Sequence, residues 1–245
     1  MRILITNDDG IHSEGIRVLA EMAAPYGEVW VVAPAAQCSA SSQSITLRTE
    51  LTALEVPFEV GCKRAFQIGG TPADCVRVAL RFLMPERPDV VFSGINYGFN
   101  TGFDIAYSGT VAAAAEALLN GIPAIAYSNK QDGSFETVTH YFQEITDRIL
   151  SEKQYPDRLW NVNFPGNTVQ ESRGVLWDRF PADVPVYDDT FIPGVVDEDG
   201  VHLTVHGEMV KPEDMPEGSD IKAVTDGYVS VGTYTCSLLS IRSKV

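Results

Sequence analysis

Two adjacent carboxylates, Asp8 and Asp9, follow a short apolar run at the start of this 245-residue chain. Neighbouring carboxylates at the end of a buried strand repel each other and are costly to desolvate unless a cation joins them. Successive strand residues point to opposite faces, so both can reach one ion only if the chain turns, and Gly10 permits that turn. Oxygen ligands suit Mg²⁺ or Mn²⁺. The pair predicts a site for one divalent ion, with a plain Asp-Gly turn as the alternative.

Two polar segments could complete such a site. Ser39 belongs to a small polar segment, 34–44, which could bring hydroxyl and N–H groups near an ion or form a Ser-rich surface loop. Asn96 belongs to a glycine-rich segment, 93–102, and its amide offers a neutral oxygen to a metal. The glycines permit close approach to a ligand, but their spacing is not that of a dinucleotide-binding G-x-G-x-x-G.

The segment Ser108, Gly109 and Thr110 opens an alanine-rich run. Ser108 is a good N-cap, and the first turn of a helix offers free N–H groups and a positive dipole end. That geometry suits a phosphate, although every helix needs a cap and Ser108 could serve only as one.

The elements that must position these residues alternate along the first 165 residues. Apolar runs typical of buried strands occupy 2–6, 29–33, 90–92 and 124–127, and helical spacing occupies 16–23, 76–83, 111–118 and 138–149. Ser13 and Thr71-Pro72 are suitable N-termini, and Gly121 closes the third helix. Alternating strands and helices predict an α/β fold, a parallel sheet with helices on both faces. Ligands of such sheets bind at the carboxyl ends of the strands, where these polar segments lie.

The character of the chain changes after Gly166. Acidic residues and proline increase, helical spacing fades across 183–218, and alternation around His202 to His206 predicts a strand. Residues 223–231 could return to the core. We expect one domain overall, with a core at 1–165 and a hairpin-like extension at 166–245 that is used in oligomerisation.

Composition excludes several classes of protein. A net charge of −15 is incompatible with indiscriminate binding to nucleic acid, and no apolar run approaches the ~18 residues that span a bilayer. The N-terminus lacks a signal-peptide pattern, so we expect a cytoplasmic protein. Four cysteines without a C-x-x-C pair argue against structural zinc and disulfides. An acidic protein can bind a phosphate ester if a cation and N–H groups supply the positive field.

Seven segments of the chain closely resemble the SurE family, the stationary-phase survival nucleotidases. They are ITNDDGI at 5–11, SIT at 44–46, GTPADCV at 70–76, PDVVFSGINYGFNTG at 88–102, YSGTVAAAAEA at 107–117, NVNFP at 161–165 and GYVSV at 227–231. They recur in family order over most of the chain.

The resemblance implies a Rossmann-like core and a phosphatase that acts on nucleoside 5′- and 3′-monophosphates with one divalent ion, Mg²⁺ or Mn²⁺. It also implies homodimers or homotetramers joined by exchanged C-terminal elements. Carried over by position, the metal ligands are Asp8, Asp9, Ser39 and Asn96, of which Asp8, Asp9 and Asn96 are also the expected catalytic residues. The phosphate-contacting helix start is Ser108, Gly109 and Thr110.

The expected mechanism is in-line attack on phosphorus by a water that the ion polarises. N–H and hydroxyl groups of Ser108 to Thr110 would stabilise the phosphoryl oxygens. Asp8 or Asp9 could instead act as base or covalent nucleophile, but ligating carboxylates are poor candidates for a second role. His12, near the acidic turn, could approach the leaving group or face solvent.

The segment 34–40 departs from the family pattern P-x-R-N-x-S-G, because it has no basic residue and carries Ala40 in place of glycine. This motivates an alternative, a catalytically weakened nucleotide-binding scaffold. A receiver-like signalling module is a further alternative, but Glu50 and Glu55 do not end a convincing strand where its phosphoaccepting Asp should be. A haloacid-dehalogenase-like phosphatase would have its two acids as D-x-D, whereas here they are adjacent.

Overall fold

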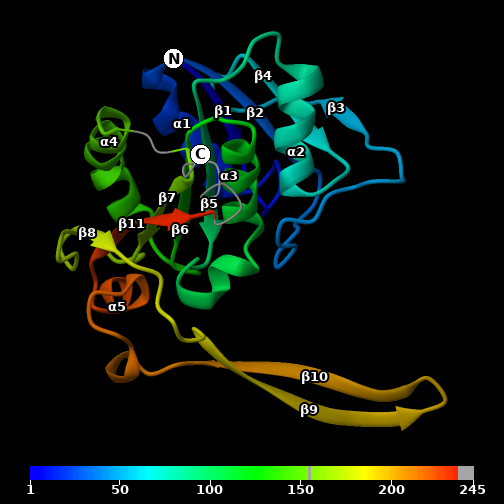
Figure 1. Cartoon of the computed structure of the whole chain (residues 1–245), viewed down its shortest axis with the longest axis vertical. Coiled ribbons are helices and arrows are strands. Elements are labelled where there is room, and N and C mark those ends of the chain that lie inside the picture. The colour runs from blue at the N-terminus through cyan, green and yellow to red at the C-terminus, as the bar shows by residue number, and fades with distance from the viewer. Residues whose placement is uncertain (154–155, 237–245) are drawn as a thin grey trace, which may run out of the picture.

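The computed structural model describes residues 1–153 and 156–236, and a nine-stranded sheet runs through its centre (Figure 1). In spatial order its strands are β3 (Ala53–Glu55), β4 (Arg64–Ile68), β2 (Glu28–Pro34), β1 (Arg2–Thr6), β5 (Val90–Tyr97), β6 (Ala124–Asn129), β7 (Arg158–Phe164), β11 (Val229–Thr235) and β8 (Val175–Arg179). The strands from β4 to β7 are parallel. β3 runs antiparallel to β4, and β11 runs antiparallel to β7 but parallel to β8. The α/β class predicted from the sequence is confirmed.

Helices cover both faces of this sheet because its strands are apolar on both sides. Ile3 and Ile5 of β1 pack in one cluster with α1 (Glu14–Ala23) and α4 (Glu136–Ser151). Leu4, which points the other way, packs with α2 (Pro72–Val78) and α3 (Gly109–Leu119). This alternation with a period of two is why the strands read as nearly continuous apolar runs.

The order of the strands reverses between β1 and β5. From β1 the chain moves outward to β2 and β4 on one side, and it later returns to build β5, β6 and β7 on the other. A crevice forms at the carboxyl ends of the strands at such a switch point. Asp8 and Asp9 follow β1 there, and Asn96 lies near the end of β5.

Several predicted bounds were wrong. The third predicted strand extends from Val90 to Tyr97, so Asn96 lies within β5 and not in a loop after it. The second predicted helix is α2, with a capping box of Thr71 and Asp74, followed by a π-helical turn η2 (Ala79–Leu83). The strands β3, β4, β7 and β8 were not predicted from the sequence. The remaining helical elements are η1 (Ala24–Tyr26), η3 (Gly102–Ala106), η4 (Pro212–Asp214) and α5 (Asp220–Thr225).

The C-terminal part contributes to the sheet and also leaves it. β8 and β11 join the sheet, whereas β9 (Tyr187–Asp197) and β10 (Gly200–Met209) form an antiparallel hairpin that extends away from the rest (Figure 1). A small core that includes Val186 and Ile221 lies near the base of the hairpin. Of the predicted extension, 237–245 lie outside the described residues. Within the described residues, no helix has both the length and the apolar character to span a bilayer.

Candidate active site

Asp8 lies against the first turn of α3. Its side chain is buried, with the residue 4% exposed, and it accepts a hydrogen bond from the Thr110 hydroxyl. A Cβ atom on Gly109 would lie 2.8 Å from the Asp8 Cβ and 3.0 Å from Oδ2, so only glycine fits there without displacement. The contact joins the end of β1 to the amide end of α3, elements that are about a hundred residues apart in sequence.

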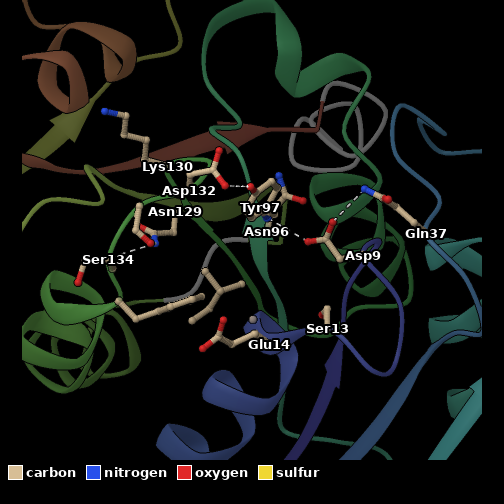
Figure 2. Close-up of a pocket in the computed structure, with 14 residues that line it drawn as sticks. Asp9, Ser13, Glu14, Gln37, Asn96, Tyr97, Asn129, Lys130, Asp132 and Ser134 are labelled. Carbon is tan, nitrogen blue, oxygen red and sulfur yellow. Dashed lines mark hydrogen bonds between the residues drawn. The ribbon is translucent and has the colours of Figure 1, made fainter.

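Asp9 is held from two sides. Its Oδ2 accepts the backbone N–H of Tyr97 at 2.9 Å, and its Oδ1 accepts from the Gln37 side chain at 3.4 Å (Figure 2). The same Gln37 nitrogen donates to the Ser39 hydroxyl at 2.9 Å. One amide therefore bridges Asp9 and Ser39, and the structure brings three of the predicted ligand-bearing segments together.

The turn after Asp9 is fixed by its own side chains. Gly10 has a φ of +94°, a conformation that favours glycine. Asn7 donates through Nδ2 to the Gly10 carbonyl at 2.9 Å and to the Ser13 hydroxyl at 2.8 Å. Ser13 occupies the N-cap position of α1, as predicted, although its hydroxyl makes no capping hydrogen bond.

Asn96 stands next to Asp9 at the end of β5 (Figure 2). Its Nδ2 donates to the Gly98 carbonyl at 3.0 Å, so the oxygen is the end of the amide left for a metal ion. The start of α1 packs tightly below, because a Cβ on Gly15 would lie 2.0 Å from the Ile95 carbonyl oxygen. Close packing of this kind limits the movement of Asn96.

Burial shapes the electrostatics of the acidic pair. Burial and, to a smaller extent, the charge of Asp9 raise the pKa of Asp8 to about 6, against a lowering hydrogen bond from Thr110. Burial also raises the pKa of Asp9, against lowering bonds from Tyr97 and Gln37. Two adjacent carboxylates that lose hydration are electrostatically suited to a cation.

The donor set fits a hard divalent ion but contains only two carboxylates. Among the described residues, no group of three or more His, Cys, Asp and Glu side chains could hold a metal ion. A cation at Asp8 and Asp9 would therefore need neutral oxygens, which Ser39 and Asn96 carry. Such all-oxygen sets suit Mg²⁺ or Mn²⁺ rather than zinc.

The predicted phosphate segment has partners within the protein. The Ser108 hydroxyl accepts from the Val111 N–H at 3.1 Å and so caps α3, while Thr110 donates to Asp8. The Thr110 carbonyl accepts from Ser93 at 2.7 Å. The Thr110 hydroxyl therefore positions Asp8 in this structure, and its contact with a phosphate stays a prediction. The buried Ser41 hydroxyl, without a partner in the described structure, would lie 2.9 Å from a Cβ on Gly109.

The segment 130–135 between β6 and α4 was not among the predicted site residues. With Asp9, Gln37 and Asn96 it lines a cavity of about 620 Å³ (Figure 2). This segment follows a parallel strand next to β5, so the rule that ligands bind at carboxyl ends of strands could have identified it. His12 lines a different cavity, of about 680 Å³, together with Arg17 and Phe58.

Comparisons with known proteins show which family and which fold the chain resembles. The family model described as "Survival protein SurE" matches residues 3–182. The chain is 35% identical to a 5′-nucleotidase SurE of Aeromonas hydrophila, over 99% of this chain and 95% of that protein. It is 41% identical to a 5′-nucleotidase SurE of Synechococcus sp. strain CC9311, over 90% and 83%. A crystal structure of the SurE protein from Aquifex aeolicus superposes with a TM-score of 0.83 at 33% identity, covering 99% of this chain and 96% of that one.

Proposed function

The chain belongs to the SurE family of survival proteins, and on this basis we propose that it is a nucleotidase that removes phosphate from nucleoside monophosphates. The relatives in Aeromonas and Synechococcus carry the name 5′-nucleotidase. The observation that carries the proposal is the contact of Asp8 with the amide end of α3 at the switch point of the sheet. The proposed metal site and the proposed phosphate site would therefore meet at Asp8.

The finer part of the proposal is metal dependence and activity on both 5′- and 3′-monophosphates. Asp8, Asp9, Ser39 and Asn96 would hold one Mg²⁺ or Mn²⁺ ion. Bound there, the ion would supply Lewis-acid activation of a water and would offset charge on the phosphoryl oxygens. This is supported by the acidic pair, whose burial favours a compensating cation.

The residues of the chain itself position the reacting groups. The Thr110 hydroxyl orients Asp8, and the Tyr97 N–H and the Gln37 amide orient Asp9. The first-turn amides of α3, at Gly109 and Thr110, would bind phosphoryl oxygens at the positive end of the helix dipole. These donors are fixed before substrate arrives, which lowers the cost of reorganisation in the transition state.

We also propose that the protein forms homodimers or homotetramers through the hairpin β9–β10. Phe191, Val201, Leu203 and Val205 are each more than half exposed, and in the register of the hairpin Val205 lies opposite Phe191. A two-stranded hairpin is marginally stable by itself, so an apolar ribbon of this length favours contact with a second copy.

A panel of nucleoside 5′- and 3′-monophosphates and glycerol phosphate, each with Mg²⁺, Mn²⁺ or EDTA, tests the proposed activity. We expect phosphate release from both nucleotide classes with a metal ion, and recovery when metal is added back after EDTA. Asp9→Asn should remove the metal-dependent rate while the melting temperature stays within a few degrees. Turnover that persists in EDTA would contradict the metal site, and nucleotide binding without turnover would favour a weakened scaffold.

A further inference from the structure

A cavity of about 620 Å³ opens directly beside Asp9 and Asn96 (Figure 2). It lies between the start of α1, the end of β5 and the segment 130–135. Its volume is within the range of small-molecule sites, and the proposed reaction uses only the edge formed by Asp9 and Asn96. The rest of the cavity has no part in that reaction and is open to another portion of the substrate.

Tyr97 connects this cavity to the reacting centre. Its main-chain N–H donates to Asp9 Oδ2 at 2.9 Å, whereas its side chain lines the cavity and is bonded through the phenol to Asp132. The residue is 52% exposed, so its ring has surface available to a ligand. The two roles are separable, because the N–H remains when the side chain is changed.

The hydroxyl of Tyr97 is hydrogen-bonded to Asp132 in the segment 130–135, and further hydrogen bonds hold this segment in place. Gly133 donates to the Lys130 carbonyl at 3.0 Å, and Ser134 donates to Gly166 at 2.8 Å. The buried Asn129 side chain donates to the Ser134 carbonyl at 3.2 Å. Asp132, on this segment, therefore offers the phenol a fixed partner, and the ring is oriented before any ligand binds.

The charge of the cavity selects against a second phosphate. Besides Asp9, the carboxylates of Glu14 and Asp132 line it, against one ammonium, that of Lys130. Figure 2 shows the Lys130 side chain pointing away from Asp9. A carboxylate accepts hydrogen bonds from hydroxyl groups but repels phosphate, so a neutral, hydroxyl-bearing leaving group suits this surface.

We propose that this cavity binds the nucleoside part of the substrate and that Tyr97, oriented by Asp132, determines specificity by stacking on the base. The proposal rests on the proposed nucleotidase activity and adds to it a selection of nucleoside monophosphates over small alkyl phosphates and over diphosphates. Stacking of a base on an aromatic side chain accounts for roughly a tenfold gain in binding.

The test compares adenosine 5′-monophosphate with glycerol phosphate, a substrate that has no ring, at saturating Mn²⁺. Tyr97→Ala should raise KM for the nucleotide about tenfold, and it should lower kcat/KM about ten times more for the nucleotide than for glycerol phosphate. Tyr97→Phe, which keeps the ring but loses the bond to Asp132, should raise KM by a smaller factor. Phe82→Ala removes an aromatic ring that is 80% exposed on η2 and serves as the matched control, with no change for either substrate.

A second variant tests whether the negative charge of the cavity lining excludes a second phosphate. Asp132→Asn keeps an oxygen acceptor for the Tyr97 phenol, and asparagine tolerates the φ of +55° at this position. We expect the ratio of kcat/KM for adenosine diphosphate to that for the monophosphate to rise at least threefold. An unchanged ratio would contradict exclusion of a second phosphate by charge.

Equal losses on both substrates in Tyr97→Ala, or none on the nucleotide, would overturn the assignment of Tyr97. Failure of the proposed activity gives a different result, namely no turnover of any ester by the unaltered protein. In that case calorimetric titration with adenosine 5′-monophosphate still tests the cavity. Binding that Tyr97→Ala weakens about tenfold would support it, and binding unaffected by the change would refute it.

Discussion

Asp8 and Gly109 meet at a distance that allows no additional atom between them. The Asp8 carboxylate is oriented by Thr110 from the same turn of α3, so its position depends on the backbone of that helix. On the other side of the site, Asp9 depends on the backbone of β5 through Tyr97. The two acids are thus placed by contacts with α3 and β5, and glycine at position 109 has a specific steric reason.

Gly109→Ala should impair the site without a large change in the fold. The added Cβ would lie 2.8 Å from Asp8 Cβ and 2.9 Å from Ser41 Oγ, so Asp8 must shift. We expect kcat/KM to fall at least a hundredfold, because misplacement of a reacting group by about 1 Å has effects of that size. Gly61→Ala, where an added Cβ meets nothing within 4 Å, is the matched control, and equal activities of the two variants would disprove the steric argument.

Ala40→Gly should stabilise the protein. Ala40 follows Ser39 with a φ of +55°, a left-handed conformation that is unfavourable for alanine and ordinary for glycine. We expect the free energy of unfolding to rise by about 1 kcal/mol, since the relief of strain exceeds the added chain entropy of the unfolded state. Urea denaturation measures this, with Ala35→Gly as control. A loss of stability in both variants would show that Ala40 is not strained.

At the scale of the elements, the positions of single strands and helices could be predicted from the sequence. Apolar periodicity located β1, β2, α1, α3 and α4, and the acidic pair directly follows β1 as the sequence indicated. Asn96 was expected in a loop because the apolar run ends at Phe92, yet pairing with β6 extends β5 to Tyr97. Strand pairing is non-local, so a single strand's sequence does not fix where it ends.

Side-chain partners were the least predictable feature. Nothing near Thr110 in sequence indicates that its hydroxyl holds Asp8, because the contact depends on how α3 packs against the end of β1. The segment 130–135 carries no motif, and its relation to Tyr97 appears only when β5 and β6 are adjacent. Both features belong to tertiary packing and not to local sequence.

Asp104, near the base of the hairpin, should make the free energy of unfolding depend on pH. Asp104 of η3 lies near Asp189 and Asp220, and burial together with these charges raises its pKa to about 6. Because the folded state binds the proton more tightly than the unfolded state does, stability is greatest below the ordinary pKa and falls as pH rises through about 6. Asp104→Asn should flatten this decline and stabilise the protein at pH 7 by about 1 kcal/mol, a value reduced for solvent screening.

Thermal denaturation of both proteins between pH 4 and pH 8 measures this effect of Asp104. Parallel stability curves for the variant and the unaltered protein would contradict the assignment of the titration to Asp104.

At the scale of the whole molecule, the hairpin β9–β10 stands out because the rest of the described chain does not cover its strands. All residues of β9 and β10 are exposed, whereas the sheet has helices on both faces (Figure 1). Leu203→Glu should convert the oligomer to monomers, because it places a charge on the apolar side of the ribbon. Thr204→Glu, on the opposite side of the same strand, should leave the assembly intact.

Sedimentation velocity distinguishes these cases for the hairpin variants. A monomeric unaltered protein would contradict assembly through the hairpin, and dissociation of both variants would contradict the assignment of its apolar side.

The central claim is that one divalent cation joins Asp8 and Asp9 beside the amide end of α3. A crystal soaked in Mn²⁺ and measured for anomalous scattering tests it most directly. We predict one strong peak within bonding distance of oxygens from Asp8, Asp9, Ser39 and Asn96, on the side of the site that faces Gly109. Strong anomalous peaks elsewhere, with the two aspartates apart and no peak between them, would contradict the claim.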